Sequence, residues 1–241
     1  MANVAEVEFL DKVVKYYTPN NITEWRAKSI YEKEPITIEW IKNVNPGEIV
    51  FDVGANVGMY SMLLAARGAE VYAFEPEALN YACLCTNIKL NNFSHVYAYC
   101  MGILDEPGFT TLNSTKEDVA VGDSMYTVGE DINFDLSPAK IGYRQGVAVT
   151  TLDSFCEITE LVPNHIKIDV DGLDYKVVNG NLKTLEKATT AIIELNPNWK
   201  EHQEAIDNMK SLGFNLDQDQ VDAATRKNNA FEGLAEHLFY K

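Results

Sequence analysis

The stretch Glu48-Ile-Val-Phe-Asp-Val-Gly-Ala-Asn-Val-Gly-Met-Tyr-Ser61 contains the strongest fold signal in the chain. Its apolar run, residues 49–51, is followed by a glycine-containing turn and then by residues that suit a helix. In α/β folds this order of strand, turn and helix presents a helix N-terminus to a ligand. Taken alone, Gly54 and Gly58 fit equally well an ordinary turn between a strand and a helix.

Two acidic residues narrow the choice of ligand. The glycine spacing is G-x-x-x-G rather than the G-x-G-x-x-G of dinucleotide binders, and Asp52 would repel a pyrophosphate. This disfavours a nicotinamide or nucleotide binder, which is the alternative reading. The next apolar run, residues 71–74, ends at Glu75-Pro76, where a carboxylate can accept hydrogen bonds from both hydroxyls of a ribose. Together these features predict S-adenosylmethionine (SAM), whose ammonium and sulfonium groups suit acidic neighbours.

Strand-like and helical runs alternate from residue 48 onward. We expect core strands near 48–53, 70–75, 96–103, 166–170 and 189–195, with helices between them, and two last strands at 214–216 and 236–240. Alternation of this kind predicts an α/β fold with a doubly wound, mostly parallel sheet. Because no long helix separates the last two strands, one of them is expected to run antiparallel.

The first 47 residues are predicted to form an N-terminal helical extension to the SAM-binding domain at 48–241. The expected face of its first helix consists of Phe9, Leu10, Val13, Val14 and Tyr17. Pro35 suits the first turn of a later helix. The extension could cover the SAM pocket, bind substrate or pack against another subunit; a simple cap on the core is the alternative.

Residues 113–146 interrupt the alternation with Ser, Thr, Asn, Gly and scattered acidic residues. A loop of this length in a compact domain is usually functional or disordered. We therefore expect a lid on the substrate side, with a flexible insertion as the alternative.

Composition argues against several function classes. The chain has 241 residues and a net charge of −16, which argues against nucleic acid or an anionic membrane surface as a partner. No apolar run approaches the roughly 20 residues needed to span a bilayer, and the first residues lack the features of a signal peptide. A cytoplasmic protein with four free thiols is therefore expected. The scattered histidines have no metal-ligand spacing, so no metal site is predicted.

A second group of polar residues follows the strand at 166–170. Lys167, Asp169 and Asp171 share one face of that strand, at the end where open α/β sheets bind ligands. They could deprotonate or orient a hydroxyl for attack on a methyl sulfonium. The alternatives are a structural Lys167–Asp169 ion pair and a helix cap by Asp171. Glu194 is either another active-site carboxylate or the partner of a core lysine.

The chain resembles the FkbM-type methyltransferases at several motifs. These are Phe51-Asp-Val-Gly-Ala-Asn-Val-Gly58, Phe74-Glu-Pro76, Asn87-Ile88, Thr151-Leu-Asp153, Ile166-Lys-Ile-Asp-Val-Asp-Gly172 and Ile193-Glu194. The resemblance implies the seven-stranded class I methyltransferase fold and O-methylation of a hydroxyl, often on a sugar or natural product. The family usually has Glu at the position of Asp171, and residues 99–102 lack the Asn-x-Ala expected there.

Motifs and resemblance together predict two sets of site residues. The cofactor-binding set is Asp52, Gly54, Ala55, Asn56, Gly58, Glu75, Pro76, Met101 and Gly102, and the catalytic set is Lys167, Asp169 and Asp171. The predicted function is a SAM-dependent O-methyltransferase acting on a hydroxyl of a sugar, glycan or small natural product. A non-catalytic SAM-binding sensor or interaction protein is the alternative, and a homo-oligomer is left open.

Overall fold

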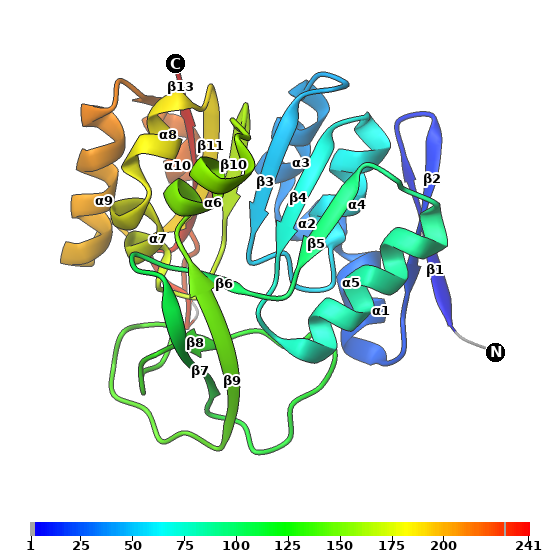
Figure 1. Ribbon diagram of the computed structural model, residues 1–241, viewed down its shortest axis with the longest axis horizontal. Helices are drawn as coiled ribbons and strands as arrows, with labels where there is room; N and C mark the ends of the chain where they lie inside the picture. The colour runs from blue at the N-terminus through cyan, green and yellow to red at the C-terminus, as the bar shows by residue number, and fades with distance from the viewer. Residues whose placement is uncertain (1–2, 229) are drawn as a thin grey trace.

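A seven-stranded mixed sheet forms the centre of the molecule in the computed structural model, which describes residues 3–228 and 230–241 (Figure 1). The strand order is β12-β13-β11-β10-β3-β4-β5, and β13 runs antiparallel to both of its neighbours. The strands are β3 (Ile49–Val53), β4 (Glu70–Phe74), β5 (Val96–Tyr99), β10 (His165–Ile168), β11 (Thr190–Leu195), β12 (Asn215–Leu216) and β13 (Ala235–Tyr240). The remaining pairings are parallel, as the alternation predicts.

Helices cover both faces of this sheet because its strands are apolar on both sides. Along β3, Val50 packs into the core on one face and Phe51 into the core on the other. The first face is covered by α4 (Met59–Arg67), α5 (Ala78–Asn91) and the N-terminal segment. The second is covered by α6 (Leu152–Thr159), α7 (Asp174–Gly180), α8 (Leu182–Lys187) and α9 (Lys200–Ser211). A short helix, α10 (Gln218–Ala224), precedes β13.

The chain changes direction across the sheet between β3 and β10. From β3 it proceeds through β4 to the edge strand β5, and it later returns to β10 on the other side of β3. Such a switch point leaves a crevice at the carboxyl ends of the strands, which is where open α/β sheets bind ligands. The turn after β3 and the turn after β10 therefore meet at one place.

The N-terminal segment begins with strands, so the prediction of a helix over residues 9–17 was wrong. β1 (Val4–Phe9) and β2 (Lys12–Tyr17) form an antiparallel hairpin. Alternate residues on these strands are buried, whereas Leu10 and Val13, both expected on the helical face, are 58% and 53% exposed. Helices follow only from residue 21 onward, as α1 (Asn21–Lys28), α2 (Ile30–Lys33) and α3 (Pro35–Asn43).

A second, four-stranded sheet lies below the strand ends in Figure 1. Among the described residues it comprises β6 (Gly102–Ile103), β7 (Gly108–Ser114), β8 (Thr127–Val128) and β9 (Tyr143–Thr150). The strand expected at 96–103 thus ends at Tyr99, and the chain crosses into this other sheet at Gly102. Most of residues 113–146 connect β7 to β9. No helix in the described parts of the chain is long and apolar enough to cross a membrane.

Candidate active site

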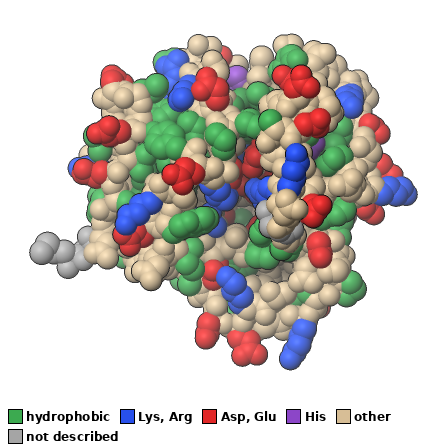
Figure 2. Space-filling model, turned by 180° about the vertical axis from the view of Figure 1, so that it is seen from behind, with side chains coloured by type: hydrophobic (Ala, Val, Ile, Leu, Met, Phe, Trp, Pro, Cys, Tyr) green, Lys and Arg blue, Asp and Glu red, His purple; other side chains and the backbone are tan. Residues whose placement is uncertain are grey.

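A cavity of about 260 Å³ opens at the carboxyl ends of β3, β4 and β10. Its walls come from the turns after these strands, from residues 101–104, from residues 124–126, from α1 and from the C-terminal segment around Arg226. A smaller recess of about 30 Å³ adjoins it under Arg26 and Lys33. Figure 2 shows a hollow near the middle of one face, in which basic and acidic side chains gather. The cavity therefore joins segments from most of the chain.

The glycine turn after β3 is shaped by a close backbone contact with the turn after β10. Gly54 has a φ of +82°, and a Cβ at this position would lie 1.8 Å from the carbonyl oxygen of Asp169. The backbone N–H groups of Gly54 and Ala55 both donate to the carbonyl oxygen of Phe74 at 3.0 Å. Glycine is required here because any side chain would separate the two turns.

Glu75 directly follows β4, and its carboxyl group is buried beside this turn. It accepts hydrogen bonds from the backbone N–H groups of Asn56 at 2.7 Å and Glu77 at 2.8 Å. Burial raises the pKa of Glu75 to about 8, and the nearby carboxylates of Glu77 and Asp171 add to the rise. Each carboxyl oxygen accepts only one of these bonds, so Glu75 can still form a hydrogen bond with a ligand in the cavity.

Most of the predicted cofactor-binding residues line the cavity or the recess, and two of them line neither. The cavity is lined by Gly54, Asn56, Glu75, Pro76, Met101 and Gly102, whereas Ala55 lines the recess. Asp52 and Gly58 line neither space. Asp52 is buried beneath the turn, where it accepts a hydrogen bond of 2.5 Å from Ser61 Oγ. Gly58 precedes α4, and a Cβ there would lie 2.4 Å from Leu84 Cδ1. Both residues therefore lie behind the turn and line neither the cavity nor the recess.

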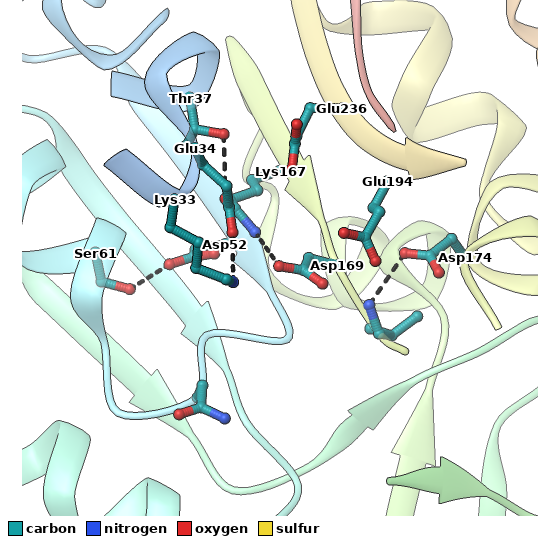
Figure 3. Close-up of polar contacts among 12 residues, drawn as sticks. Lys33, Glu34, Thr37, Asp52, Ser61, Lys167, Asp169, Asp174, Glu194 and Glu236 are labelled. Carbon is teal, nitrogen blue, oxygen red and sulfur yellow. Dashed lines mark hydrogen bonds and ion pairs between the residues drawn. The ribbon is translucent and has the colours of Figure 1, made fainter. Parts of the chain in front are cut away.

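A network of buried charges lies on the face of the sheet that the N-terminal helices cover. Lys167 is aligned with Asp52 on the neighbouring strand, and its Nζ donates to Asp169 Oδ2 at 2.9 Å. Lys33 Nζ contacts Glu34 Oε1 at 2.6 Å, and Thr37 Oγ1 donates to Glu34 Oε2 at 3.3 Å. Figure 3 shows Glu34 and Thr37 descending from the N-terminal helices toward Lys167. Three separate segments thus supply the network.

This network keeps Asp169 ionised. Burial alone would raise the pKa of Asp169, but the ammonium groups of Lys167 and Lys33 outweigh it and hold the pKa well below its usual range. Burial would likewise lower the pKa of Lys167, and the carboxylates of Asp169, Glu34 and Asp52 raise it instead. The ion pair considered as a structural alternative is therefore present. Even so, 25% of the Asp169 side chain is exposed, and it lines both the cavity and the recess.

Asp171 does not cap the following helix. Its Oδ2 accepts hydrogen bonds from the backbone N–H groups of Met125 at 2.6 Å and Tyr126 at 3.2 Å, within the long segment between β7 and β9. The turn itself is held by Asp174, which accepts from the N–H groups of Val170 and Gly172, both at 3.0 Å. Burial raises the pKa of Asp171 to about 6, and the Asp169 carboxylate adds to the effect. Asp171 thus joins the strand end to the segment above the cavity.

Glu194 lines the cavity, as expected of an active-site carboxylate, and its ion-pair partner is an arginine rather than the lysine of the other alternative. Arg226 contacts Glu194 at 2.6 Å and Glu236 at 3.2 Å, and it lines the cavity. Sequence reasoning missed Arg226, Lys33, Glu34 and Arg26 as residues of the site. Lys33, Glu34 and Arg26 precede the recognisable motifs, and Arg226 follows them, so no local spacing connected them with the strand ends.

Comparison with known proteins places the chain among methyltransferases. The FkbM methyltransferase domain matches residues 52–216, well over half of the chain. The chain is 22% identical to the hexuronic acid methyltransferase AglP of Haloferax volcanii over 189 residues, which are 74% of this chain and 69% of the relative. It is 37% identical to the 31-O-demethyl-FK506 methyltransferase FkbM of Streptomyces tacrolimicus over 67 residues, which are 27% of this chain and 25% of the relative.

A solved structure shows the same architecture. The magnesium protoporphyrin IX methyltransferase ChlM of Synechocystis PCC 6803, determined with bound SAM, has a TM-score of 0.51 at 11% identity. The alignment covers 92% of this chain and 85% of that chain. The fold is thus that of the class I SAM methyltransferases. The protein belongs to the FkbM methyltransferase family and uses SAM as its cofactor.

Proposed function

We propose that this protein is an O-methyltransferase that methylates a hydroxyl of a sugar, a glycan or a small natural product. The observation that carries the proposal is the position of Asp169. This residue is an ionised carboxylate that opens into the cavity formed by the glycine turn and Glu75. The names of two relatives, one acting on a hexuronic acid and one on an O-demethylated natural product, support this class of acceptor.

The cavity residues fit SAM on the cofactor side. Glu75 provides a buried acceptor for ribose hydroxyls, and Gly54 leaves room for a ligand to lie against the backbone of the turn. Pro76, Met101 and Gly102 form the neighbouring wall, which is the expected place of the adenine ring. In this proposal Asp52 and Gly58 act indirectly, because they hold the turn in shape without contacting the ligand.

On the acceptor side, Asp169 accepts the hydrogen bond of the acceptor hydroxyl and orients its lone pair toward the methyl group. SAM supplies that methyl group in activated form, so alignment and exclusion of water are the main tasks of the protein. Asp169 would receive the hydroxyl proton as the new O–C bond forms, while the C–S bond to the transferred methyl group breaks and S-adenosylhomocysteine leaves. Lys167 acts as a positioning residue, since its ammonium fixes the Asp169 carboxylate.

Residues 113–146 serve as the lid in this proposal. Besides Met125 and Tyr126, the lid is connected to the cofactor side, since Asn56 Nδ2 donates to the carbonyl oxygen of Asp123 at 2.8 Å. Asp171 therefore acts by keeping the lid in contact with the strand end. Trp25, at the end of the cavity nearest α1, is 54% exposed and offers a flat apolar surface to an acceptor ring.

The test is methyl transfer from SAM carrying a radiolabelled methyl group to a panel of neutral sugars, uronic acids and hydroxylated natural products. We expect label in an alkali-stable methyl ether. We expect Asp169→Asn to bind S-adenosylhomocysteine with wild-type affinity in calorimetry and to lose at least about a hundredfold in turnover, as general-base variants commonly do. Asp135→Asn, on the exposed surface of the same lid, is the control and should behave as the wild type.

Two results would contradict the proposal. Label that mild alkali releases as methanol would show that the acceptor atom belongs to a carboxylate rather than a hydroxyl. Wild-type turnover in Asp169→Asn would remove Asp169 from the reaction while leaving SAM binding unaffected.

A further inference from the structure

Two basic residues at the cavity precede the segment that the family comparison matches. Arg26 lies on α1 and Lys33 ends α2, whereas the FkbM domain match begins at residue 52. Both line the cavity and also the recess, whose other walls include Gly54, Ala55 and Asn56. Two cations from the N-terminal helices therefore lie beside the glycine turn.

The two cations differ in how they are neutralised. Lys33 Nζ forms an ion pair with Glu34 Oε1 at 2.6 Å, and its charge also lowers the pKa of Asp169. Arg26 makes no ion pair with any residue in the described part of the chain, although its guanidinium is one of the groups that lower the pKa of Asp171 against the effect of burial. Its Nε donates to the carbonyl oxygen of Gly122 at 2.7 Å, which fixes the side chain against the lid. In a chain with a net charge of −16, such a cation at the cavity indicates an anionic ligand group.

We propose that Arg26 binds the carboxylate of the methionine part of SAM. At neutral pH this carboxylate is the one anionic group of the cofactor, and the ammonium and sulfonium groups would be repelled by a guanidinium. The recess that Arg26 lines is formed by the same turn that the cofactor lies against. The assignment depends on the SAM dependence of the family and not on the proposed acceptor, so binding alone can test it.

The sharpest test compares SAM with decarboxylated SAM, which differs only in lacking the carboxylate. Binding of both to Arg26→Gln and to the wild type is measured by calorimetry. We expect the variant to bind SAM more weakly by on the order of tenfold to a hundredfold, the loss typical of a charge-assisted hydrogen bond. Its affinity for decarboxylated SAM should equal that of the wild type.

Arg67→Gln is the matched control. Arg67 also donates through Nε to a backbone oxygen, that of Lys42 at 3.1 Å, and it lies outside the cavity. This variant should bind both ligands as the wild type does. If Arg26→Gln is unstable, Arg26→Lys keeps the charge and should retain part of the preference for SAM.

Two outcomes would overturn the assignment. Equal losses of affinity for SAM and decarboxylated SAM would show that Arg26 only supports the shape of the site. Unchanged affinity for both, together with a raised KM for the acceptor, would show that Arg26 binds the acceptor instead. Neither result depends on whether the transferred methyl group ends on a hydroxyl.

Discussion

The glycine turn and the charge network adjoin the same cavity but are held in place by different forces. The turn, residues 52–58, is built from backbone hydrogen bonds and from a contact so close that Gly54 has no room for a side chain. The network joins charged side chains from three segments, among them Glu34, Lys167 and Asp169, and its charges must balance. We therefore expect the turn to be sensitive to an added side chain and the network to be sensitive to the loss of a charge.

Gly54→Ala tests the steric side of this comparison and should have the largest effect. The new Cβ would lie 1.8 Å from a backbone oxygen, so the turns after β3 and β10 must separate. We expect a loss of more than about 4 kcal/mol in the free energy of unfolding, measured by urea denaturation. Gly47→Ala is the control, because Gly47 has a φ of +84° and no atom within 4 Å of the new Cβ. It should cost only about 1–2 kcal/mol.

A similar loss in both glycine variants would mean that positive φ alone, and not the contact with Asp169, makes glycine necessary at the turn.

Lys167→Met tests the electrostatic side. The substitution preserves most of the side-chain volume, but it removes the ion-pair partner of Asp169 and leaves Lys33 as the remaining cation beside Asp169 and Glu34. We expect a loss of about 3–5 kcal/mol in the free energy of unfolding. Lys200→Met is the control, since its pair with Glu204 at 3.7 Å lies on the surface. It should change stability by less than about 1 kcal/mol. Equal effects in the two variants would show that the buried network contributes no more than a surface pair.

The raised pKa of Glu75 predicts a pH dependence that joins the two regions. The pKa of Glu75 is near 4.3 in the unfolded chain and about 8 in the folded protein. At a pH between these two values, the unfolded chain has lost a proton that the folded protein keeps. Stability should therefore fall as pH rises through this window, by on the order of 1 kcal/mol per pH unit from Glu75. Glu75→Gln should show a shallower fall between pH 5 and pH 8 in urea denaturation.

Glu106 is exposed, so Glu106→Gln serves as the reference. The stability of this variant should fall with pH as steeply as that of the wild type. A Glu75→Gln variant with the wild-type slope would show that Glu75 is already ionised in the folded protein.

Asp171→Ala should have the smallest and most local effect. It removes the acceptor of the Met125 and Tyr126 N–H groups and leaves the turn held by Asp174. We expect faster hydrogen exchange at residues 124–128 and a loss of only about 1 kcal/mol in global stability. Asp135→Ala, which removes a bond to Ser137 within the same lid, should leave exchange at 124–128 unchanged. Unchanged exchange in Asp171→Ala would show that other contacts hold the lid.

The sequence by itself determined those features that depend on residues close together along the chain. The order of strands and helices after residue 48 follows from runs of apolar residues, and the glycine turn from residues adjacent along the chain. The N-terminal hairpin was missed because a short run of apolar residues can fit both the helical period of about 3.6 residues and the two-residue alternation of a strand. Phe9, Val14 and Tyr17 fit a helix, while burial of Val7, Phe9, Val14 and Tyr16 follows the alternation of a hairpin.

Only the tertiary structure decided which charges meet. Asp171 suited a cap on its own helix by spacing, but it binds a segment more than 40 residues earlier in the chain. Glu34 and Lys33 reach the strand ends from helices before the recognised domain, and Arg226 reaches them from beyond it. The reason is physical: charge interactions depend on distance in space and on burial, and neither is encoded by spacing along the chain.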